Sequence, residues 1–240
     1  MDSIGANLQA VKVRIARAAA AAGRDAKDIT LVAVSKTFGA DAMRCAYAAG
    51  QRAFGENYVQ EALPKMAALA ELSIEWHFVG PIQSNKTRAI AEHFDWAHGI
   101  DRLKIAERLA AARPGGRAPL QVCIEVNLGG EMTKGGVAPD QASALARAIG
   151  SLPGLELRGL MTVPPASRDT AQQRRWFARL RTLREEIAAG GVPLDTLSIG
   201  MSNDLEAAVA EGATLVRVGT AIFGARKKPE PQRRRDAEKV

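Results

Sequence analysis

Short apolar runs alternate along this chain with segments whose apolar residues recur every three or four positions. Residues 3–22 form the first periodic segment, which is typical of an amphipathic helix. Its spaced apolar residues are Ile4, Leu8, Val11 and Ile15. The apolar run that follows, residues 31–34, contains two β-branched valines and predicts a short strand buried on both faces.

The alternation continues and predicts eight strands, each followed by a helix or by a helical terminal segment. The predicted strands are residues 31–36, 52–56, 74–80, 95–100, 120–127, 155–163, 194–200 and 214–219. The predicted later helices are residues 41–49, 59–71, 87–93, 101–112, 140–152, 169–189 and 204–211. This order favours an α/β fold with a parallel sheet. A single (β/α)₈ TIM barrel with an extra N-terminal helix is favoured over an open doubly wound sheet, since no strand carries G-x-G-x-x-G.

Composition agrees with one globular domain. The chain has 240 residues, of which 47% are hydrophobic and 25% charged, and barrels of this length count as single domains. We expect a cytoplasmic protein, because the sequence shows neither a signal peptide nor an apolar run of the roughly 18 residues that cross a bilayer. Cys45 and Cys123 lie far apart in apolar surroundings, which favours two free, buried thiols.

The basic charge is concentrated at the C-terminus. The formal net charge is +7, and residues 226–240 contribute +4 of it. This segment lacks aromatic residues and apolar periodicity, so we expect a barrel over residues 1–225 and a disordered basic tail over residues 226–240. A nucleic-acid-binding module remains an alternative because of the charge, but we expect no specific nucleic-acid partner.

Lys36 follows a buried strand directly, where a charged amine is costly. One interpretation is that Lys36 leans into solvent or pairs with a carboxylate. The other is that its pKa is lowered, so that the neutral amine attacks a carbonyl and forms a Schiff base. The hexapeptide alone leaves both open.

Polar residues also follow several other predicted strands. The active site of a TIM barrel lies at the carboxyl ends of its strands, and a phosphate site is frequently built after strands 7 and 8. Ser202 follows the seventh strand, and Gly219 and Thr220 end the eighth. A plain helix cap at Ser202 and a strand exit at Gly219 are alternatives, but the two loops together favour a phosphate site. Asn57 ends the second strand.

Arg217 interrupts the apolar residues of the last strand and shares a face with Leu215 and Gly219. Its guanidinium either points into the barrel mouth or forms a structural ion pair among the outer helices.

A phosphate site combined with a strand-end lysine suggests pyridoxal 5′-phosphate (PLP). The sequence also resembles the YggS/PROSC family of pyridoxal phosphate homeostasis proteins, from about residue 29 to residue 225. The matching segments are residues 33–37, 54–61, 76–86, 158–161, 198–204 and 216–224. The resemblance implies a barrel like the N-terminal domain of alanine racemase, the fold type III of PLP proteins.

The resemblance also implies roles for individual residues. Lys36 resembles the lysine that forms the aldimine with PLP, and Asn57 looks like a pocket-lining residue. Arg217 looks like the residue that faces the pyridine nitrogen, where it would leave that nitrogen unprotonated. The predicted phosphate ligands are Ser202, Gly219 and Thr220. The family motifs also include His77, Asn85 and Lys134, whose contact with the cofactor stays open.

The sequence leaves two functions open. The resemblance implies a PLP-binding protein of intracellular PLP homeostasis, which buffers the cofactor and transfers it, with PLP-requiring apo-enzymes as partners and without robust turnover. A monomer is favoured over a dimer, and no metal or membrane is expected. The alternative is a PLP-dependent racemase or lyase that uses His77 or a water as a second acid or base. Racemases of this fold bring a tyrosine from a second domain, whereas Tyr47 lies in a segment predicted to be helical and Tyr58 lies directly before another.

Overall fold

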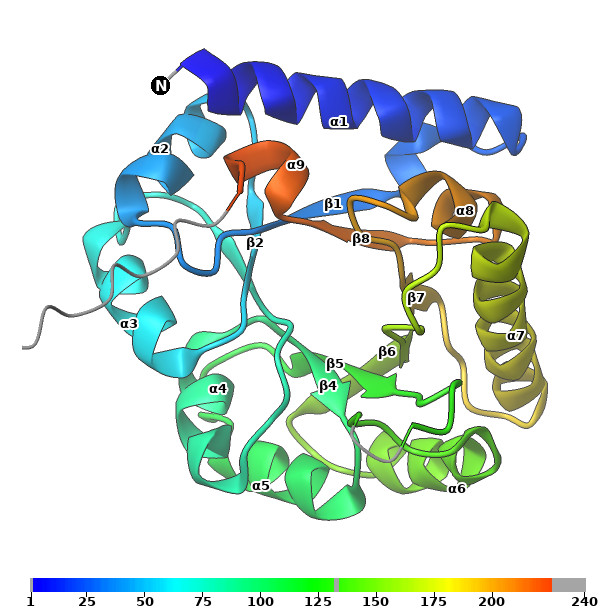
Figure 1. Ribbon diagram of the computed structural model, residues 1–240. Coiled ribbons are helices and arrows are strands. Elements are labelled where there is room, and N and C mark those ends of the chain that lie inside the picture. Colours follow the sequence, from blue (N-terminus) through cyan, green and yellow to red (C-terminus); the bar gives the residue numbers. More distant parts are fainter. Residues whose placement is uncertain (1, 132–133, 226–240) are drawn as a thin grey trace, which may run out of the picture.

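The computed structural model describes residues 2–131 and 134–225. Within these residues eight parallel strands close into a barrel in sequence order, and helices surround it (Figure 1). The strands are β1 (Thr30–Val34), β2 (Ala53–Glu56), β3 (Glu75–Phe78), β4 (Trp96–Ile100), β5 (Leu120–Glu125), β6 (Leu155–Met161), β7 (Thr196–Ser198) and β8 (Leu215–Val218). The predicted closed barrel is confirmed, and the open doubly wound sheet is wrong.

The helices follow the predicted alternation closely. They are α1 (Asp2–Ala21), α2 (Ala40–Ala48), α3 (Val59–Ala68), α4 (Thr87–His93), α5 (Leu103–Ala112), α6 (Pro139–Gly150), α7 (Thr170–Ala189), α8 (Leu205–Ala210) and α9 (Thr220–Phe223). Two short 3₁₀ turns, η1 (Ala26–Asp28) and η2 (Ser84–Lys86), precede β1 and α4.

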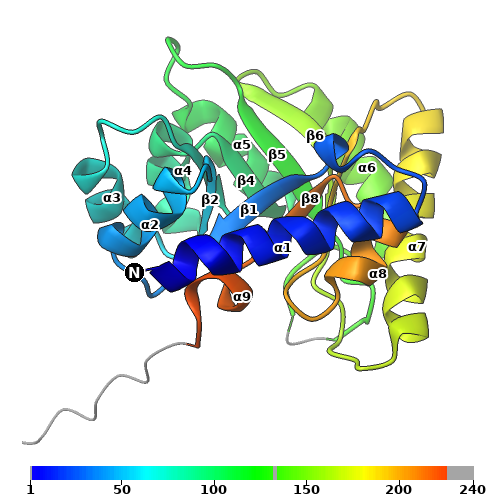
Figure 2. The same ribbon diagram turned by 90° about the horizontal axis from the view of Figure 1, so that it is seen from above.

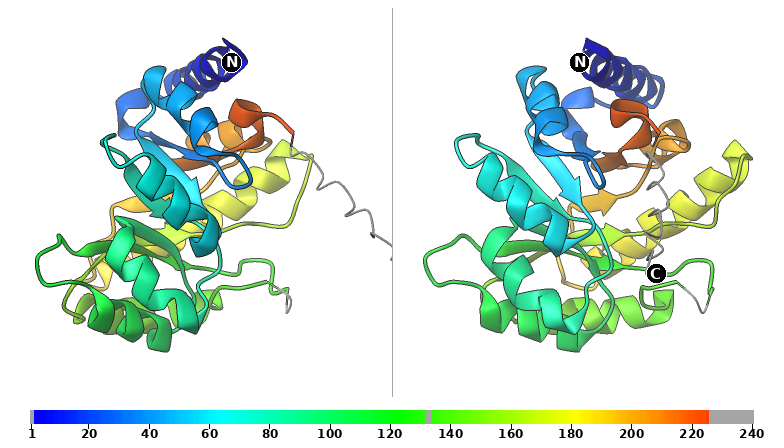
Figure 3. Two further views of the ribbon diagram at one scale, coloured as in Figure 1. Left: turned by 90° about the vertical axis from the view of Figure 1, so that its left-hand side faces the viewer. Right: turned by 60° about the vertical axis from the view of Figure 1, so that its left-hand side comes forward.

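The extra N-terminal helix is confirmed as α1. Its apolar stripe, which includes Leu8, Val11 and Ile15, is buried, because this face packs against α8 and α9. Figures 2 and 3 show α1 outside the ring of strands, beside the elements that follow β7 and β8. Helix α1 therefore supports the strand ends from which the predicted phosphate site is built.

Two apolar layers hold the barrel together. The larger layer lies between the strands and the surrounding helices. The smaller one fills the barrel interior and consists of Val32, Ala53, Trp96, Cys123, Met161 and Leu215. Cys123 is a free thiol, and burial raises its pKa to about 12, so it stays protonated. An interior packed in this way is a core and not a pore.

Several strands are shorter than the sequence predicts. The predicted strand at residues 194–200 is reduced to β7, Thr196–Ser198, and Gly200 turns the chain away with a φ of 93°. Residues that leave the strands in this way form the rim at their carboxyl ends, which we call the C-terminal mouth. The predicted basic tail, residues 226–240, lies outside the described residues. None of the helices between residues 2 and 225 that the structure describes is long and apolar enough to cross a membrane.

Candidate functional site

A cavity of about 430 Å³ opens at the C-terminal mouth. Residues from most of the strand ends line it, and all six residues predicted as cofactor ligands are among them: Lys36, Asn57, Ser202, Arg217, Gly219 and Thr220. The remaining lining is Val34, Val79, Gly80, Pro81, Glu125, Met161, Val163, Met201 and Asn203. The fold thus brings together predicted ligands that lie up to 184 positions apart in the sequence.

The barrel closure places Lys36 beside the end of β8. Strand β1 pairs with β8 in the register Ala33 to Val218, so the residues that follow both strands emerge side by side. Gly219 fits closely here, because a Cβ at this position would lie 3.0 Å from the Val34 carbonyl oxygen. The half-buried Lys36 side chain and the Gly219 backbone therefore line the same side of the cavity.

A buried ionic cluster fixes the backbone just before Lys36. The ammonium of Lys65 on α3 donates to the Ser35 carbonyl (3.0 Å) and to Glu56 Oε1 (2.7 Å). The Ser35 hydroxyl donates to the same carboxylate oxygen at 2.6 Å. Burial raises the pKa of the Glu56 carboxyl, while the bonds from Lys65 and Ser35 act in the opposite direction. A buried pair of this kind costs desolvation, and its benefit is a defined geometry.

The residue after Lys36 is fixed as well. Thr37 has a φ of 69°, a left-handed conformation that is uncommon for a non-glycine residue. Its backbone N–H donates to Glu61 Oε2 at 3.0 Å, and Glu61 lies 4.0 Å from the Lys65 ammonium. Contacts from β2 and α3 therefore hold both neighbours of Lys36, so the lysine stands on a rigid turn.

The part of the cavity formed by the loops after β7 and β8 carries hydroxyls and backbone N–H groups. The Ser202 loop is held in place by Arg14 of α1, which donates to the Ser202 carbonyl at 3.0 Å. The Ser202 hydroxyl accepts a weak bond from the Ala221 N–H at 3.4 Å, which links the loop after β7 to the loop after β8. Together with the exposed Thr220, Ser202 forms a group of donors that suits an anion.

Arg217 is buried inside the barrel and reaches the cavity from below. Its Nη1 donates to the Ser198 carbonyl and to the Ser198 hydroxyl (2.6 Å), and its Nη2 donates to the Thr162 carbonyl at 3.0 Å. Burial lowers the pKa of the guanidinium, while the carboxylates of Asp204 and Glu125 act in the opposite direction. Of the two orientations that the sequence left open, the one into the barrel mouth is confirmed.

Asn57 brings a polar atom to the cavity that the protein itself does not satisfy. Its Oδ1 is buried and has no hydrogen-bond partner among the described residues. The Asn57 backbone also packs against Gly80, where a Cβ would approach the Asn57 carbonyl oxygen to 2.5 Å. An orphaned acceptor in a ligand-sized cavity indicates a ligand that donates a hydrogen bond or contributes a water.

The donor set fits PLP. An amine at the end of a strand can join an aldehyde, a cluster of hydroxyl and N–H donors can hold a phosphate, and a buried guanidinium can face a ring nitrogen. Lys36, the Ser202–Thr220 side and Arg217 supply these three groups around one cavity. The orphaned Asn57 oxygen adds a further polar contact.

Comparison with known proteins assigns the family. Residues 6–227 match the family "Alanine racemase, N-terminal domain". The pyridoxal phosphate homeostasis protein of Pseudomonas aeruginosa is 58% identical over 94% of this chain and 97% of its own length. The protein of the same name from Escherichia coli K12 is 48% identical over 94% of this chain and 98% of its own length. The chain belongs to the family of pyridoxal phosphate homeostasis proteins.

The solved structure of a similar protein agrees with the fold. PipY of Synechococcus elongatus, determined with PLP bound, superimposes with a TM-score of 0.77 and is 42% identical. The alignment covers 82% of this chain and 93% of PipY. The resemblance stated from the sequence motifs is therefore confirmed at the level of the family and of the barrel.

Three residues of the family motifs do not line this cavity. His77 is fully buried inside the barrel, Asn85 lies exposed in η2, and Lys134 forms an ion pair with Glu131 at 2.6 Å. The two tyrosines are also absent from the cavity lining that the described residues form.

Sequence reasoning missed Glu125, the last residue of β5, which lines the cavity. Burial raises the pKa of its carboxyl, and Arg217 acts in the opposite direction. The signal was present in the sequence, because Glu125 interrupts an apolar strand two residues before the predicted strand end. Asn127, at that predicted end, is the more conspicuous polar residue, but its side chain is bonded to the following loop, at the Gly130 N–H and the Glu131 carbonyl.

Proposed function

We propose that this chain binds PLP in the cavity at the C-terminal mouth and serves the homeostasis of the cofactor in the cell. It takes up PLP, holds it covalently through Lys36 and transfers it to enzymes that require it. The observation that carries the proposal is the convergence of Lys36, Arg217 and the Ser202–Thr220 donors on one cavity. The names of the relatives and the PLP bound to PipY support it.

Five of the lining residues have separate roles in this proposal. Bound PLP supplies an aldehyde for covalent attachment and an electron-accepting ring. Lys36 provides the amine, and the rigid turn around it keeps that amine at the strand ends. Ser202, Gly219 and Thr220 hold the phosphate through hydroxyl and N–H donors. Arg217 keeps its own proton and so leaves the ring nitrogen unprotonated, which weakens the ring as an electron sink.

A PLP ring that accepts electrons weakly favours storage of the cofactor over catalytic turnover of amino acids. Racemisation requires acid and base groups on both faces of the reacting carbon, and neither Tyr47 nor Tyr58 is among the residues that line the cavity. The relatives are named as homeostasis proteins, in agreement with this role. We therefore propose that this protein has no robust catalytic activity.

One observation favours the alternative of a PLP-dependent racemase or lyase. The Glu125 carboxyl lines the same cavity, and burial raises its pKa. A carboxyl that holds its proton more readily than usual can act as an acid or a base. Glu125 is a better candidate for this role than His77, which is enclosed in the barrel interior.

The setting of the protein is part of the proposal. We propose a cytoplasmic monomer whose partners are PLP and PLP-requiring apo-enzymes. We further propose that residues 1–225 suffice for PLP binding and that the basic segment at residues 226–240 accounts for any weak affinity for polyanions. Deletion of residues 226–240 should then leave PLP binding intact and abolish any retention on nucleic acid.

The experiment that separates storage from catalysis uses the PLP-loaded protein in two assays. Incubation with a panel of L- and D-amino acids should give no turnover above the level of Lys36→Ala. Mixing with a PLP-requiring apo-enzyme should restore the activity of that enzyme, whereas protein whose cofactor has been fixed by borohydride should restore none. Reproducible racemase or lyase turnover that disappears in Lys36→Ala would refute storage, and loss of that turnover in Glu125→Gln would favour the alternative.

A further inference from the structure

A row of hydrogen-bonded side chains crosses the interior of the barrel below the PLP cavity. From the Ser198 hydroxyl, which Arg217 contacts, the row continues to His98 Nδ1 at 2.7 Å. His98 Nε2 lies 3.0 Å from His77 Nδ1, and His77 Nε2 lies 2.6 Å from Glu75 Oε1. We call Ser198, His98, His77 and Glu75 the inner chain. It joins strands β7, β4 and β3 across the barrel.

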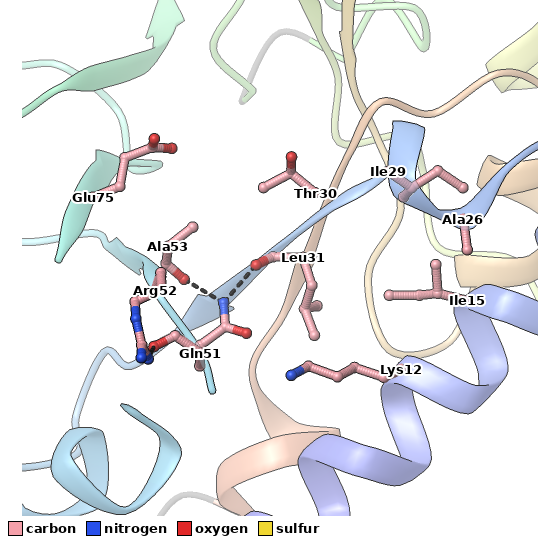
Figure 4. A pocket seen from close by; sticks show the side chains of 10 residues that line it. All are labelled: Lys12, Ile15, Ala26, Ile29, Thr30, Leu31, Gln51, Arg52, Ala53 and Glu75. Carbon is pink, nitrogen blue, oxygen red and sulfur yellow. Dashed lines mark hydrogen bonds between the residues drawn. The ribbon is translucent and has the colours of Figure 1, made fainter. Parts of the chain in front are cut away.

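The inner chain ends at the amino ends of the strands, which we call the N-terminal mouth. Glu75 is the first residue of β3 and lines a second cavity of about 400 Å³ there (Figure 4). Its side chain is 47% exposed, whereas the imidazoles of His77 and His98 are completely buried. The inner chain therefore runs from solvent at the N-terminal mouth to the Arg217 guanidinium at the C-terminal mouth.

The partners determine which atom donates in each bond. Arg217 has only donors, so the Ser198 oxygen accepts from it and directs its own hydrogen to His98 Nδ1. His98 must then carry its proton on Nε2 and donate to His77 Nδ1. His77 in turn donates from Nε2 to the Glu75 carboxylate. In this arrangement every donor has an acceptor, and both imidazoles are neutral.

The reverse arrangement is unfavourable. It would need an additional proton on Glu75 or on His77, and it would leave the Ser198 hydroxyl hydrogen without an acceptor among the partners found for it in the described residues. Burial lowers the pKa of His98 well below its ordinary value, and the charge of Arg217 acts in the same direction. His98 is neutral in both arrangements, so the hydrogen of the Ser198 hydroxyl and the additional proton decide between them.

The packing around the imidazoles keeps their planes fixed. The Trp96 ring stacks on His77 with centroids 5.5 Å apart and an angle of 11° between the planes. The His77 and His98 rings are tilted by 60° at a centroid distance of 5.2 Å. Since neither imidazole can rotate without losing these contacts, the position of the Ser198 hydroxyl is fixed from below as well.

We propose that the inner chain is a positioning device for Arg217: from the opposite mouth of the barrel it fixes the guanidinium, which would face the nitrogen of the PLP ring. This inference rests on the proposed function, because it assumes that Arg217 binds the ring nitrogen. It assigns no proton transfer to the chain, since Arg217 retains its protons. Ser198, His98, His77 and Glu75 are positioning residues that act on the cofactor through Arg217 alone.

The effect on the cofactor should decrease along the chain. Ser198 contacts Arg217 directly, whereas Glu75 is three bonds further away and partly solvated. Loss of one hydrogen bond to a charged group corresponds to about a tenfold change in an equilibrium constant. We therefore expect about a tenfold weaker affinity for PLP in Ser198→Ala, less in His98→Gln, and less than about twofold in Glu75→Gln.

The first test needs no cofactor. The sequence contains three histidines, and His93 on the surface serves as an internal reference. Nitrogen-15 NMR of the protein without PLP should show His77 and His98 as neutral imidazoles with the proton on Nε2. Ser198→Ala should perturb His98 most. Imidazoles that carry the proton on Nδ1, or whose ring protons exchange freely with water, would overturn the assigned direction of the hydrogen bonds in the inner chain.

The second test follows the ring nitrogen of ¹⁵N-labelled PLP bound to the protein. Ser198→Ala should shift this resonance and lower the affinity for PLP. Thr196→Val is the matched control. The Thr196 hydroxyl is buried on the same face of β7 as Ser198, but it bonds to Asp195, which is not part of the inner chain. Thr196→Val should lower stability by a similar amount and leave the resonance unchanged. Equal resonances in Ser198→Ala and in the wild type would overturn the proposal.

The two tests distinguish this inference from the proposed function. If the wild type does not bind PLP, the proposed function fails whatever the histidines show. If the wild type binds PLP and the nitrogen resonance does not respond to Ser198→Ala, the inner chain serves only the stability of the barrel.

Discussion

The two mouths of the barrel hold similar groups and differ in how firmly those groups are fixed. Their cavities measure about 430 Å³ and 400 Å³. Each is lined by one lysine, one arginine and one glutamate. At the C-terminal mouth these are Lys36, Arg217 and Glu125, and at the N-terminal mouth they are Lys12, Arg52 and Glu75.

The arrangement of these groups separates the two cavities. Arg217 is 6% exposed and held by three hydrogen bonds from inside the barrel. Arg52 is exposed, bonds to two nearby carbonyls and stacks on Tyr47 with its Cζ 3.8 Å from the ring centroid. Lys36 stands on a clamped turn, whereas Lys12 extends from the helix α1 (Figure 4). A cofactor site thus depends on fixed geometry more than on residue types.

The largest expected difference between the mouths concerns the arginines. Arg217→Met removes the donors to Thr162 and Ser198 inside the barrel, so it should lower the free energy of unfolding by about 4 kcal/mol. Arg52→Met should lower it by less than about 1 kcal/mol, since Arg52 is exposed. Urea denaturation of both variants measures the difference. Equal losses would mean that the two mouths are equally rigid.

The second prediction concerns the lysine that holds the turn before Lys36. Lys65→Met leaves the buried Glu56 carboxylate without its partner and should cost about 3 kcal/mol. Lys12→Met at the other mouth should cost less than about 0.5 kcal/mol. Thermal denaturation compares them. A cost below about 1 kcal/mol for Lys65→Met would contradict the description of the cluster as a fixed support for Lys36.

The third prediction compares two side-chain amides. Asn57→Ala removes an unsatisfied buried oxygen, so stability should stay the same or rise slightly, while the affinity for PLP falls about tenfold. Gln51→Ala breaks bonds to the Leu31 and Ala53 carbonyls (2.6 and 2.7 Å; Figure 4). It should cost about 2 kcal/mol and leave the affinity unchanged. The opposite pattern would show that the orphaned oxygen has no role in binding.

The smallest expected effects come from the two glutamates, whose pKa values are shifted in opposite directions. The hydrogen bond from His77 lowers the pKa of Glu75, so the stability that Glu75 contributes is present above its ordinary value of 4.5 and is lost as the pH falls. Burial raises the pKa of Glu125, so its contribution is lost as the pH rises through that raised value.

Substitution by glutamine should therefore have opposite consequences at the two mouths. Glu75→Gln should flatten the loss of stability below pH 4.5. Glu125→Gln should be slightly more stable than the wild type at neutral pH and should lose that advantage in acid. Both differences should remain below about 1 kcal/mol, and chemical denaturation as a function of pH detects them. If the difference in stability from the wild type changed with pH in the same direction for both variants, the environments assigned to Glu75 and Glu125 would be contradicted.

The sequence alone was sufficient to predict the barrel and the residues at its strand ends. The alternation of strands and helices defined the fold, and the fold defines where strand ends meet. Lys36, Ser202 and Thr220 could therefore be placed on one rim from their positions in the chain. The observed strands are shorter than the predicted ones because rim residues leave the ladder to build loops, which periodicity does not record.

Features that depend on packing between distant strands were not predictable. The sequence predicts His77 only as a residue of the family motifs or as an acid or base, since no local signal shows that β3 and β4 bring its ring to that of His98 and that Ser198 bonds to His98 from β7. The same holds for Lys65. This residue lies on the helix α3, and its ammonium reaches the buried carboxylate of Glu56. Such contacts follow from the barrel closure and from side-chain length, not from spacing along the chain.

The central claim, that Lys36 holds PLP at the C-terminal mouth, is tested most directly by the visible absorption spectrum of the purified protein with added PLP. Wild type and Lys12→Ala should show the band of lysine-bound cofactor, and borohydride should fix it irreversibly. Lys36→Ala should show only the spectrum of free or non-covalently bound PLP. A wild type without the band, or a Lys36→Ala variant that retains it in a borohydride-fixable form, would contradict the account.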